Sequence, residues 1–211
     1  MFITLEGMEG SGKSTLLAGL ASRLEAAGRT VLRTCEPGGS ALGLELRALL
    51  LRTDSDVTPM AELFLFLADR AQHVAKVIRP ALARGEVVLC DRYVDSTLVY
   101  QGTGRGLPLD TLFSLCDLTI GSLWPDATLV LDLDAKIGLA RAVSRHEGEG
   151  TFAAEGRFEA EALDFHQRVR QGFVRLAEQE PDRINLVDAS LPPPALLDAA
   201  WSVLAGRGLV P

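Results

Sequence analysis

The stretch GMEGSGKST, which begins at Gly7, has the residue types and the spacing needed to hold a phosphate. Four residues separate Gly7 from Gly12, and Lys13 and Ser14 follow directly, as in a P-loop. Glycines let the backbone curl so that several N–H groups converge on one anion, Lys13 adds a positive charge, and the Ser14 hydroxyl can ligate Mg²⁺. These features predict a nucleotide-binding loop, which consists of Gly7, Met8, Glu9, Gly10, Ser11, Gly12, Lys13, Ser14 and Thr15.

The residues around this loop are those that a P-loop requires. MFITLE before it is typical of a buried strand, and leucines recur at helical spacing over residues 14–27 after it. A glycine-rich turn without a ligand is the alternative, but such a turn does not need Lys13 and Ser14 at these positions. We expect Lys13 to lie on an exposed loop.

The composition limits the classes of function. The 211 residues suit one domain, and 21 basic against 28 acidic residues leave a net charge of −7. This acidity argues against a general nucleic-acid or membrane-surface binder, and no apolar stretch approaches membrane-spanning length. We expect no signal peptide, and the three cysteines show neither metal spacing nor a disulfide framework. A cytoplasmic protein is therefore expected.

Short apolar runs alternate with helical patterns along the chain. The expected strands are residues 1–6, 30–34, 86–91, 127–134 and 184–188, and the expected helices are residues 14–27, 43–52, 59–84, 96–101, 110–119, 135–145 and 159–180. Nearly all-apolar strands that alternate with helices indicate an α/β fold, in which a parallel five-stranded sheet of the P-loop NTPase type has helices on both faces. Ligands gather at the carboxyl ends of such strands, where Gly7, Glu36, Asp91 and Asp132 fall.

Residues 146–156, HEGEGTFAAEG, differ from the rest because they are rich in glycine and carboxylates and lack apolar periodicity. We interpret them as a mobile flap between two helices; an ordinary surface loop is the alternative. Arg141, Arg145 and Arg157 flank this flap, so a lid over about residues 141–157 is expected to bring a positive charge to a bound phosphate.

Three acidic and basic residues are expected at the ligand edge of the sheet. Asp91, at the end of a strand, can hold Mg²⁺, and Arg92 beside it can clamp a phosphate; a structural ion pair is the alternative. Glu36, in CEPGGS, is expected at the same edge, although a plain turn would explain its proline and glycines.

Two pairs of residues four apart have the character of base readers. Phe66 and Arg70 could stack on a base and read its edge, and Thr97 and Gln101 are small polar readers. A Leu/Phe stripe is more often part of a core, which is the interpretation that we favour for Phe64.

Several stretches together resemble thymidylate kinases of the bacterial type over nearly the whole chain. They are ITLEGMEGSGKST, EPGG, LRALLL, LFLFLADRAQH, VVLCDRYVDSTLVYQG, LWPDATLVLDLD and GRFEAEALDFHQRVRQGF. The P-loop is shared by many enzymes, whereas DRYVDSTLVYQG together with EPGG and DRAQH is much more specific. The resemblance implies transfer of the ATP γ-phosphoryl group to the 5′-phosphate of dTMP, with Mg²⁺, by a homodimer whose contact face could include the helix expected over residues 59–84.

The resemblance also implies roles for the acceptor-site residues. Arg47 and Arg92 would hold the dTMP phosphate, and Phe66 would stack on thymine. The polar edge of the base would be read by Arg70, Thr97 and Gln101, with Tyr100 against the sugar. In the same way Ser14, Asp91 and Glu36 would organise Mg²⁺ and water, while Lys13 and the loop hold ATP.

Two positions depart from common patterns of the family. The P-loop carries the acidic Glu9 where some members have a basic residue, so a lid arginine is expected to meet the transferring phosphate. Cys35 stands where many members have arginine, and either the phosphate clamp has one contact fewer or Arg33 takes that place. A kinase for another nucleotide, such as dUMP, and a non-enzymatic P-loop ATP-binding regulator remain alternatives.

Overall fold

The computed structural model describes residues 1–210, and its centre is a sheet of five parallel strands. The spatial order is β2-β3-β1-β4-β5. The strands are β1 (Phe2–Glu6), β2 (Val31–Cys35), β3 (Val87–Asp91), β4 (Ala127–Asp132) and β5 (Ile184–Asp188). The expected five-stranded parallel sheet is therefore confirmed, with each strand within about two residues of its predicted range.

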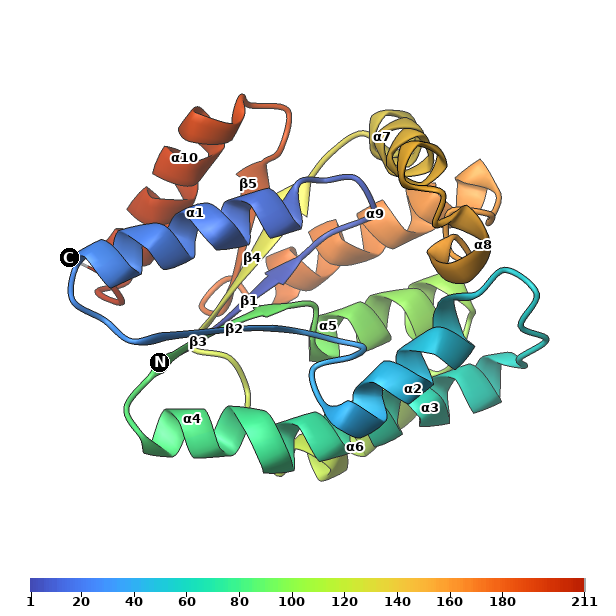
Figure 1. The fold of residues 1–211 in the computed structure, drawn as a ribbon, viewed down its shortest axis with the longest axis horizontal. Coiled ribbons are helices and arrows are strands. Elements are labelled where there is room, and N and C mark those ends of the chain that lie inside the picture. The colour runs from blue at the N-terminus through green and yellow to red at the C-terminus, as the bar shows by residue number, and fades with distance from the viewer. Residues whose placement is uncertain (211) are drawn as a thin grey trace.

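Helices cover both faces of this sheet, as the nearly all-apolar strands predict (Figure 1). Helices α1 (Lys13–Ala26) and α10 (Pro193–Gly206) lie on one face, where their leucines pack on Ile3, Leu5 and Leu89. Neighbouring strand residues such as Val88 and Cys90 point to the other face. The period of two along each strand thus divides the core between two helical layers.

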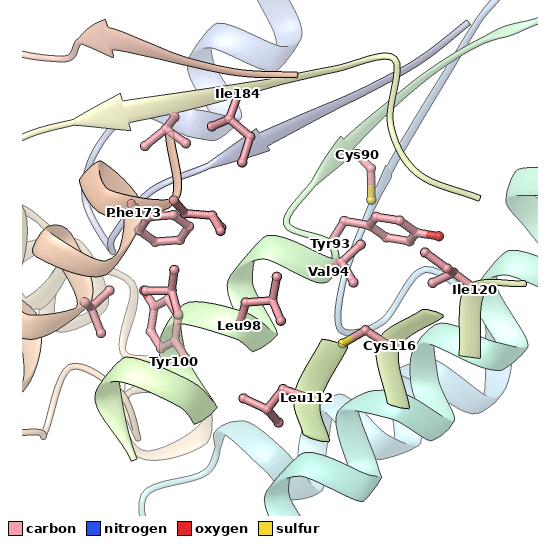
Figure 2. Packing of buried hydrophobic residues seen from close by; sticks show 14 of the residues in the cluster. Cys90, Tyr93, Val94, Leu98, Tyr100, Leu112, Cys116, Ile120, Phe173 and Ile184 are labelled. Atoms are coloured by element: carbon pink, nitrogen blue, oxygen red, sulfur yellow. The ribbon is translucent and has the colours of Figure 1, made fainter. Parts of the chain in front are cut away.

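The second layer carries most of the functional elements. It contains α3 (Pro59–His73), α5 (Val94–Thr97), α6 (Leu109–Ile120) and α9 (Leu163–Gln179). Figure 2 shows its packing, in which Tyr93, Leu98 and Tyr100 from the middle of the layer meet Phe173 of α9 and Cys116 of α6. Cys90 of β3 is fully buried where the sheet meets this layer.

Two helical predictions need correction, and one helix was missed. The helix expected over residues 59–84 is α3, a π-helical segment η1 (Val74–Ile78) and α4 (Arg79–Ala83). The short helix expected at residues 96–101 is α5 continued by a second π-helical segment, η2 (Leu98–Gly104). Helix α10 was not predicted, because the prolines at its start and its nearly all-apolar sequence hide a helical period.

The expected flap is largely helical. Helix α7 (Ala135–Glu149) continues into the first four residues of the glycine-rich stretch and ends before Gly150, whose positive φ closes it. A short helix α8 (Phe152–Glu155) follows and lies beside α2 (Ala41–Leu51) in Figure 1. Glycine within a helix costs only about 1 kcal/mol relative to alanine, so composition alone was a poor guide here.

Phe64 was wrongly assigned to the core, since its side chain is 54% exposed on α3.

Within the described residues, no helix is long and apolar enough to cross a membrane.

Candidate active site

A cleft of about 440 Å³ opens at the carboxyl ends of β1, β2 and β3, which is a size suited to small-molecule ligands. The P-loop forms one end of the cleft, α3 with α5 and η2 forms the other, and the lid helices border it. The predicted site residues that line it are Glu9, Gly10, Gly12, Lys13, Ser14, Thr15, Glu36, Arg47, Phe66, Arg70, Asp91, Arg92, Thr97, Tyr100, Gln101 and Arg145. Residues predicted from distant stretches thus meet in one cavity.

The P-loop backbone has the shape that its glycines predict. Gly7, Gly10 and Gly12 all have positive φ, and a Cβ on Gly10 would come within 2.0 Å of the backbone oxygen of Gly138. Of the predicted loop residues, the side chains of Met8 and Ser11 are buried beneath the loop, and neither these two residues nor Gly7 lines the cleft. These three residues can take part in the predicted nucleotide-binding loop only through their backbone N–H groups.

Lys13 is not on an exposed loop; it begins α1 and is 7% exposed. Its Nζ donates to the backbone oxygens of Gly7 at 3.0 Å and Met8 at 2.9 Å. Burial, together with the nearby Arg92, lowers the pKa of Lys13 to about 8. An anion in the cleft would relieve this penalty, so the loop is electrostatically ready for phosphate.

A hydroxyl and a carboxylate meet where a P-loop holds its cation. Ser14 Oγ donates to Asp91 Oδ2 at 3.3 Å, and Asp91 Oδ1 is buried without a hydrogen-bond partner. Among the described residues, no three acidic, histidine or cysteine side chains form a metal cage. This arrangement fits Mg²⁺, which usually takes one or two protein ligands and completes its shell with water and phosphate.

Glu36 is held in place by two buried side chains. Its Oε2 accepts from Arg70 Nε at 2.7 Å, and its Oε1 lies 2.9 Å from His73 Nδ1. The glutamate lines the cleft, and each of its oxygens already has one buried partner. Each oxygen keeps a second lone pair, so the role of Glu36 at the metal stays a prediction, while Ser14 and Asp91 are the better placed ligands.

The end of the cleft formed by α3 and α5 is a closely hydrogen-bonded group. Arg70 is 1% exposed, and it donates from Nη1 to Thr97 Oγ1 at 2.8 Å and from Nη2 to the Tyr93 oxygen at 2.9 Å. Phe66, half-buried one turn earlier on α3, lines the cleft with these residues. An aromatic ring beside fixed polar groups is an arrangement that can stack on a base and read its edge.

Glu9 and Arg92 form the floor between the two ends of the cleft. Glu9 Oε1 accepts from Arg92 Nη2 at 2.9 Å and from the Tyr100 hydroxyl at 2.6 Å. Burial raises the pKa of Glu9, but Arg92 and His166 outweigh it, so the pKa of Glu9 lies below its ordinary value. Arg92 has a φ of 68°, and such strain in a non-glycine residue is typical of functional sites.

Arg47 lines the cleft with its guanidinium already paired. Its Nε and Nη2 donate to the two carboxylate oxygens of Glu155 in α8, at 3.2 and 3.0 Å. Cys35 also lines the cleft, whereas Arg33 lies outside it and pairs with Glu25 on α1. Arg33 therefore does not take the place of an arginine at position 35.

The three lid arginines have different environments. Arg145 lines the cleft with a side chain that is 49% exposed. Arg141 is exposed on the same helix but does not line the cleft. Arg157 does not line the cleft, and its Nη2 lies 2.7 Å from Glu62 Oε2.

The comparisons with known proteins agree with this geometry. The family model described as thymidylate kinase matches residues 5–199. The chain belongs to the thymidylate kinase family. It is 57% identical to a thymidylate kinase of Solidesulfovibrio magneticus, with 97% of this chain and 98% of the relative covered, and 58% identical to one of Desulfovibrio desulfuricans, with 99% and 100% covered. A crystal structure of thymidylate kinase from Ehrlichia chaffeensis matches with a TM-score of 0.79 and 31% identity, covering 97% and 98% of the two chains.

The predicted family is thus confirmed. With it are confirmed the P-loop NTPase fold and the class of enzyme, an ATP-dependent nucleoside monophosphate kinase. Reasoning from the sequence nevertheless missed residues that shape this thymidylate kinase site. Buried Glu6, whose pKa is raised to about 7 chiefly by burial and Asp95, holds the turn after β3 by accepting from the Tyr93 N–H at 2.7 Å and from Ser96 Oγ at 2.6 Å. An acid at the end of a buried strand was the available signal for Glu6.

On the lid side, the missed residues are Glu155, His146 and Glu159, which line the cleft together with Phe158. His146 Nε2 lies 3.1 Å from Glu159 Oε1, and His146 Nδ1 lies 2.7 Å from Thr151 Oγ1. Nothing in their local spacing pointed to the cleft, because α7 and α8 reach it only through the folding of the lid.

Proposed function

We propose that this thymidylate kinase family member transfers the γ-phosphoryl group of ATP to the 5′-phosphate of dTMP through the cleft just described. The observation that carries this proposal is that one cavity joins the P-loop to a pair of arginines, Arg47 and Arg92. The same cavity continues to the end formed by α3, α5 and η2, which we call the base-reading end and which is lined by Phe66, Arg70, Thr97 and Gln101. A regulator that only binds ATP has no use for the second half of this cavity. An acceptor nucleoside without a phosphate would make no use of the two arginines, Arg47 and Arg92, that line this part of the cleft.

In the proposed reaction, an oxygen of the dTMP phosphate attacks the γ-phosphorus, and the bond from that phosphorus to the β–γ bridging oxygen breaks. The products are dTDP and ADP. Two anions must approach each other, so catalysis consists largely of positioning and neutralisation of charge. Lys13 and the loop N–H groups hold the ATP phosphates, and Arg92 and Arg47 hold the acceptor phosphate.

Mg²⁺, which Ser14 and Asp91 would hold, would neutralise charge on the ATP phosphates when bound. Apart from Lys13 the P-loop offers no further cation, because it carries the acidic Glu9 where another basic residue could stand, so the lid is proposed to supply the remaining positive charge. Arg145 is the best placed of the three arginines, because it lines the cleft while Arg141 and Arg157 do not. Closure of residues 141–157 would also exclude water and protect ATP from hydrolysis.

A panel of acceptors tests the function. ADP release from ATP-Mg should be fast with dTMP and slow with dCMP, dAMP, dGMP and thymidine, while dUMP measures tolerance for the missing methyl group. Lys13→Ala should lower kcat with dTMP by roughly a hundredfold or more, since its charge acts on the transferring group. Because Lys13 is buried, a melting curve of the variant must show that it is folded. Near-normal turnover of a folded variant would refute the P-loop mechanism.

We further propose that the chain works in the cytoplasm as one domain and as a homodimer. Its three cysteines are free, which suits a reducing compartment. Met60 and Phe64, four apart on α3, are 45% and 54% exposed, and a second copy would cover them. Sedimentation equilibrium should give a dimer for the native chain and a monomer for Phe64→Asp; a monomeric native chain would rule this part out.

A further inference from the structure

Two helical segments face each other across the base-reading end and are joined by two hydrogen bonds. Glu62, Phe66 and Arg70 are each four residues apart along one side of α3. Opposite them, Thr97 accepts from Arg70 Nη1 at 2.8 Å, and Gln101 Nε2 donates to Glu62 Oε1 at 2.8 Å. Phe66 lies on α3 midway between Glu62 and Arg70, the two residues that make these bonds, and it lines the cleft.

Glu62 is completely buried and does not line the cleft. Two guanidinium groups hold it: Arg105 Nε and Nη2 each lie 3.2 Å from one of its oxygens, and Arg157 Nη2 lies 2.7 Å from Oε2. A buried ion cluster seldom adds stability over well-packed apolar residues. The cluster is therefore better explained by the group that it orients, which is the side-chain amide of Gln101.

The charge of Glu62 decides which way that amide points. A carboxylate between two guanidinium groups accepts hydrogen bonds and donates none, so the end of Gln101 that faces it must be the NH₂ group. This partner therefore leaves the amide one orientation. Gln101 lines the cleft, so its carbonyl oxygen is the polar atom left for a ligand.

We propose that Glu62 is a positioning residue which, by fixing Gln101, restricts the acceptor to a pyrimidine with a keto group at C4 and a hydrogen on N3. This inference rests on the proposed function. Arg70 is a donor only and suits the O4 keto oxygen, and the Gln101 carbonyl suits the N3–H of thymine or uracil. Cytosine reverses both groups, with an amino group at C4 and an acceptor at N3, so it would leave buried polar groups unpaired.

Glu62→Gln tests the proposal with almost no change of shape. The new amide would keep its oxygen at the Oε2 position, where Arg105 Nη2 and Arg157 Nη2 donate, and would place its NH₂ group at the Oε1 position, facing Gln101 and giving up the bond from Arg105 Nε. Gln101 would then rotate and present its own NH₂ group to the base. We expect the ratio of kcat/KM for dTMP to that for dCMP to fall roughly tenfold or more, with the KM for ATP unchanged.

Glu161→Gln is the matched control. Glu161 Oε1 accepts from Arg105 Nη1 at 2.5 Å but does not contact Gln101 in the described structure, so this change removes the same charge beside the same arginine. Its dTMP-to-dCMP ratio should remain that of the native enzyme. In a Gln101→Met background, Glu62→Gln should change the ratio no further.

The outcomes separate this inference from the proposed function. A native enzyme that does not phosphorylate dTMP refutes the function. A native enzyme that does, with equal ratios for Glu62→Gln and Glu161→Gln, refutes the positioning role of Glu62.

If Glu62→Gln does not fold, hydrogen exchange of the side-chain amides in the native protein gives the answer. The Gln101 NH₂ signals, assigned by their loss in Gln101→Met, should exchange slowly and stay slow when dTMP binds. Exchange as fast as that of an exposed glutamine would overturn the proposal.

Discussion

Two arginine–glutamate pairs lie on the same cleft but in opposite environments. Arg70 and Glu36, at the base-reading end, are 2.7 Å apart with side chains that are each 2% exposed. Arg47 and Glu155, beneath the lid, are 3.0 Å apart with side chains 31% and 40% exposed. The first pair is enclosed by His73, Thr97 and the backbone of Tyr93, whereas the second joins a helix to the lid and meets solvent.

The difference teaches how one chemical pairing can serve two purposes. Removing one partner of a buried pair leaves a desolvated charge, so the buried pair is held as part of the fold. An exposed pair contributes about 0–1 kcal/mol and can exchange its partner at little cost. We infer that the base-reading end is built before the substrate arrives, whereas Glu155 holds Arg47 until a phosphate replaces it.

The largest expected effect is on stability at the buried pair. Glu36→Ala leaves the Arg70 charge without its carboxylate, so the free energy of unfolding should fall by about 3–5 kcal/mol. Glu155→Ala, the matched change at the exposed pair, should cost less than about 1 kcal/mol. Urea denaturation of both variants measures the contrast, and similar losses for the two would break the comparison.

The next effect is on kcat at the lid. Arg145→Ala should lower kcat roughly 100-fold while the KM for dTMP changes little, because its charge is needed most in the transition state. Arg141→Ala, on the same helix but away from the cleft, is the control. Steady-state kinetics should be measured for these two variants and for Arg157→Ala. A near-normal kcat in all three would mean that no lid arginine stabilises the transferring phosphate and that Arg92 does so alone.

A smaller effect is expected on the binding of dTMP at the base-reading end of the cleft. Phe66→Ala should raise the KM for dTMP by an amount worth about 1–3 kcal/mol and leave the KM for ATP nearly unchanged. Phe64→Ala, two residues away and exposed, should affect neither constant when assayed at one protein concentration. Equal changes in both constants together with a large loss of stability would mean that Phe66 is a core residue.

The smallest effect is expected from Glu155→Gln. The variant removes the carboxylate that competes with the acceptor phosphate for Arg47, so dTMP should bind a few-fold more tightly, within about 1 kcal/mol. Calorimetric titration at low and high salt measures this, and the gain should shrink as salt screens the pair. Weaker binding would show that Glu155 supports the site and does not compete for Arg47.

The strands and helices that could be predicted from the sequence are those whose hydrophobic pattern is contained within a short stretch of residues. All five strands were predictable because each is a short apolar run between helical patterns, and α1 because leucines repeat after the P-loop. Helix α10 and the helical lid were not, since an all-apolar helix has no polar face to reveal its period, and glycines in α7 and before α8 imitate a loop.

Site residues divide in the same way. Lys13, Ser14, Arg92, Phe66 and Gln101 were found because their motifs are contiguous or repeat every four residues. Other contacts join residues far apart in the chain. Glu155 meets Arg47 across 108 positions, and Glu6 meets Tyr93 across 87. No local spacing encodes such a meeting.

The sequence by itself determined the chemistry of this protein, because the residues that hold phosphate form one loop whose backbone shape its glycines dictate. Tertiary structure alone decided which similar residues serve the cleft. It turned Phe66 toward the cleft and Phe64 toward solvent, and it gave Arg157 to Glu62 while leaving Arg145 at the cleft. The physical reason is burial: identical side chains differ in effect only once folding has set their distance from water and from opposite charges.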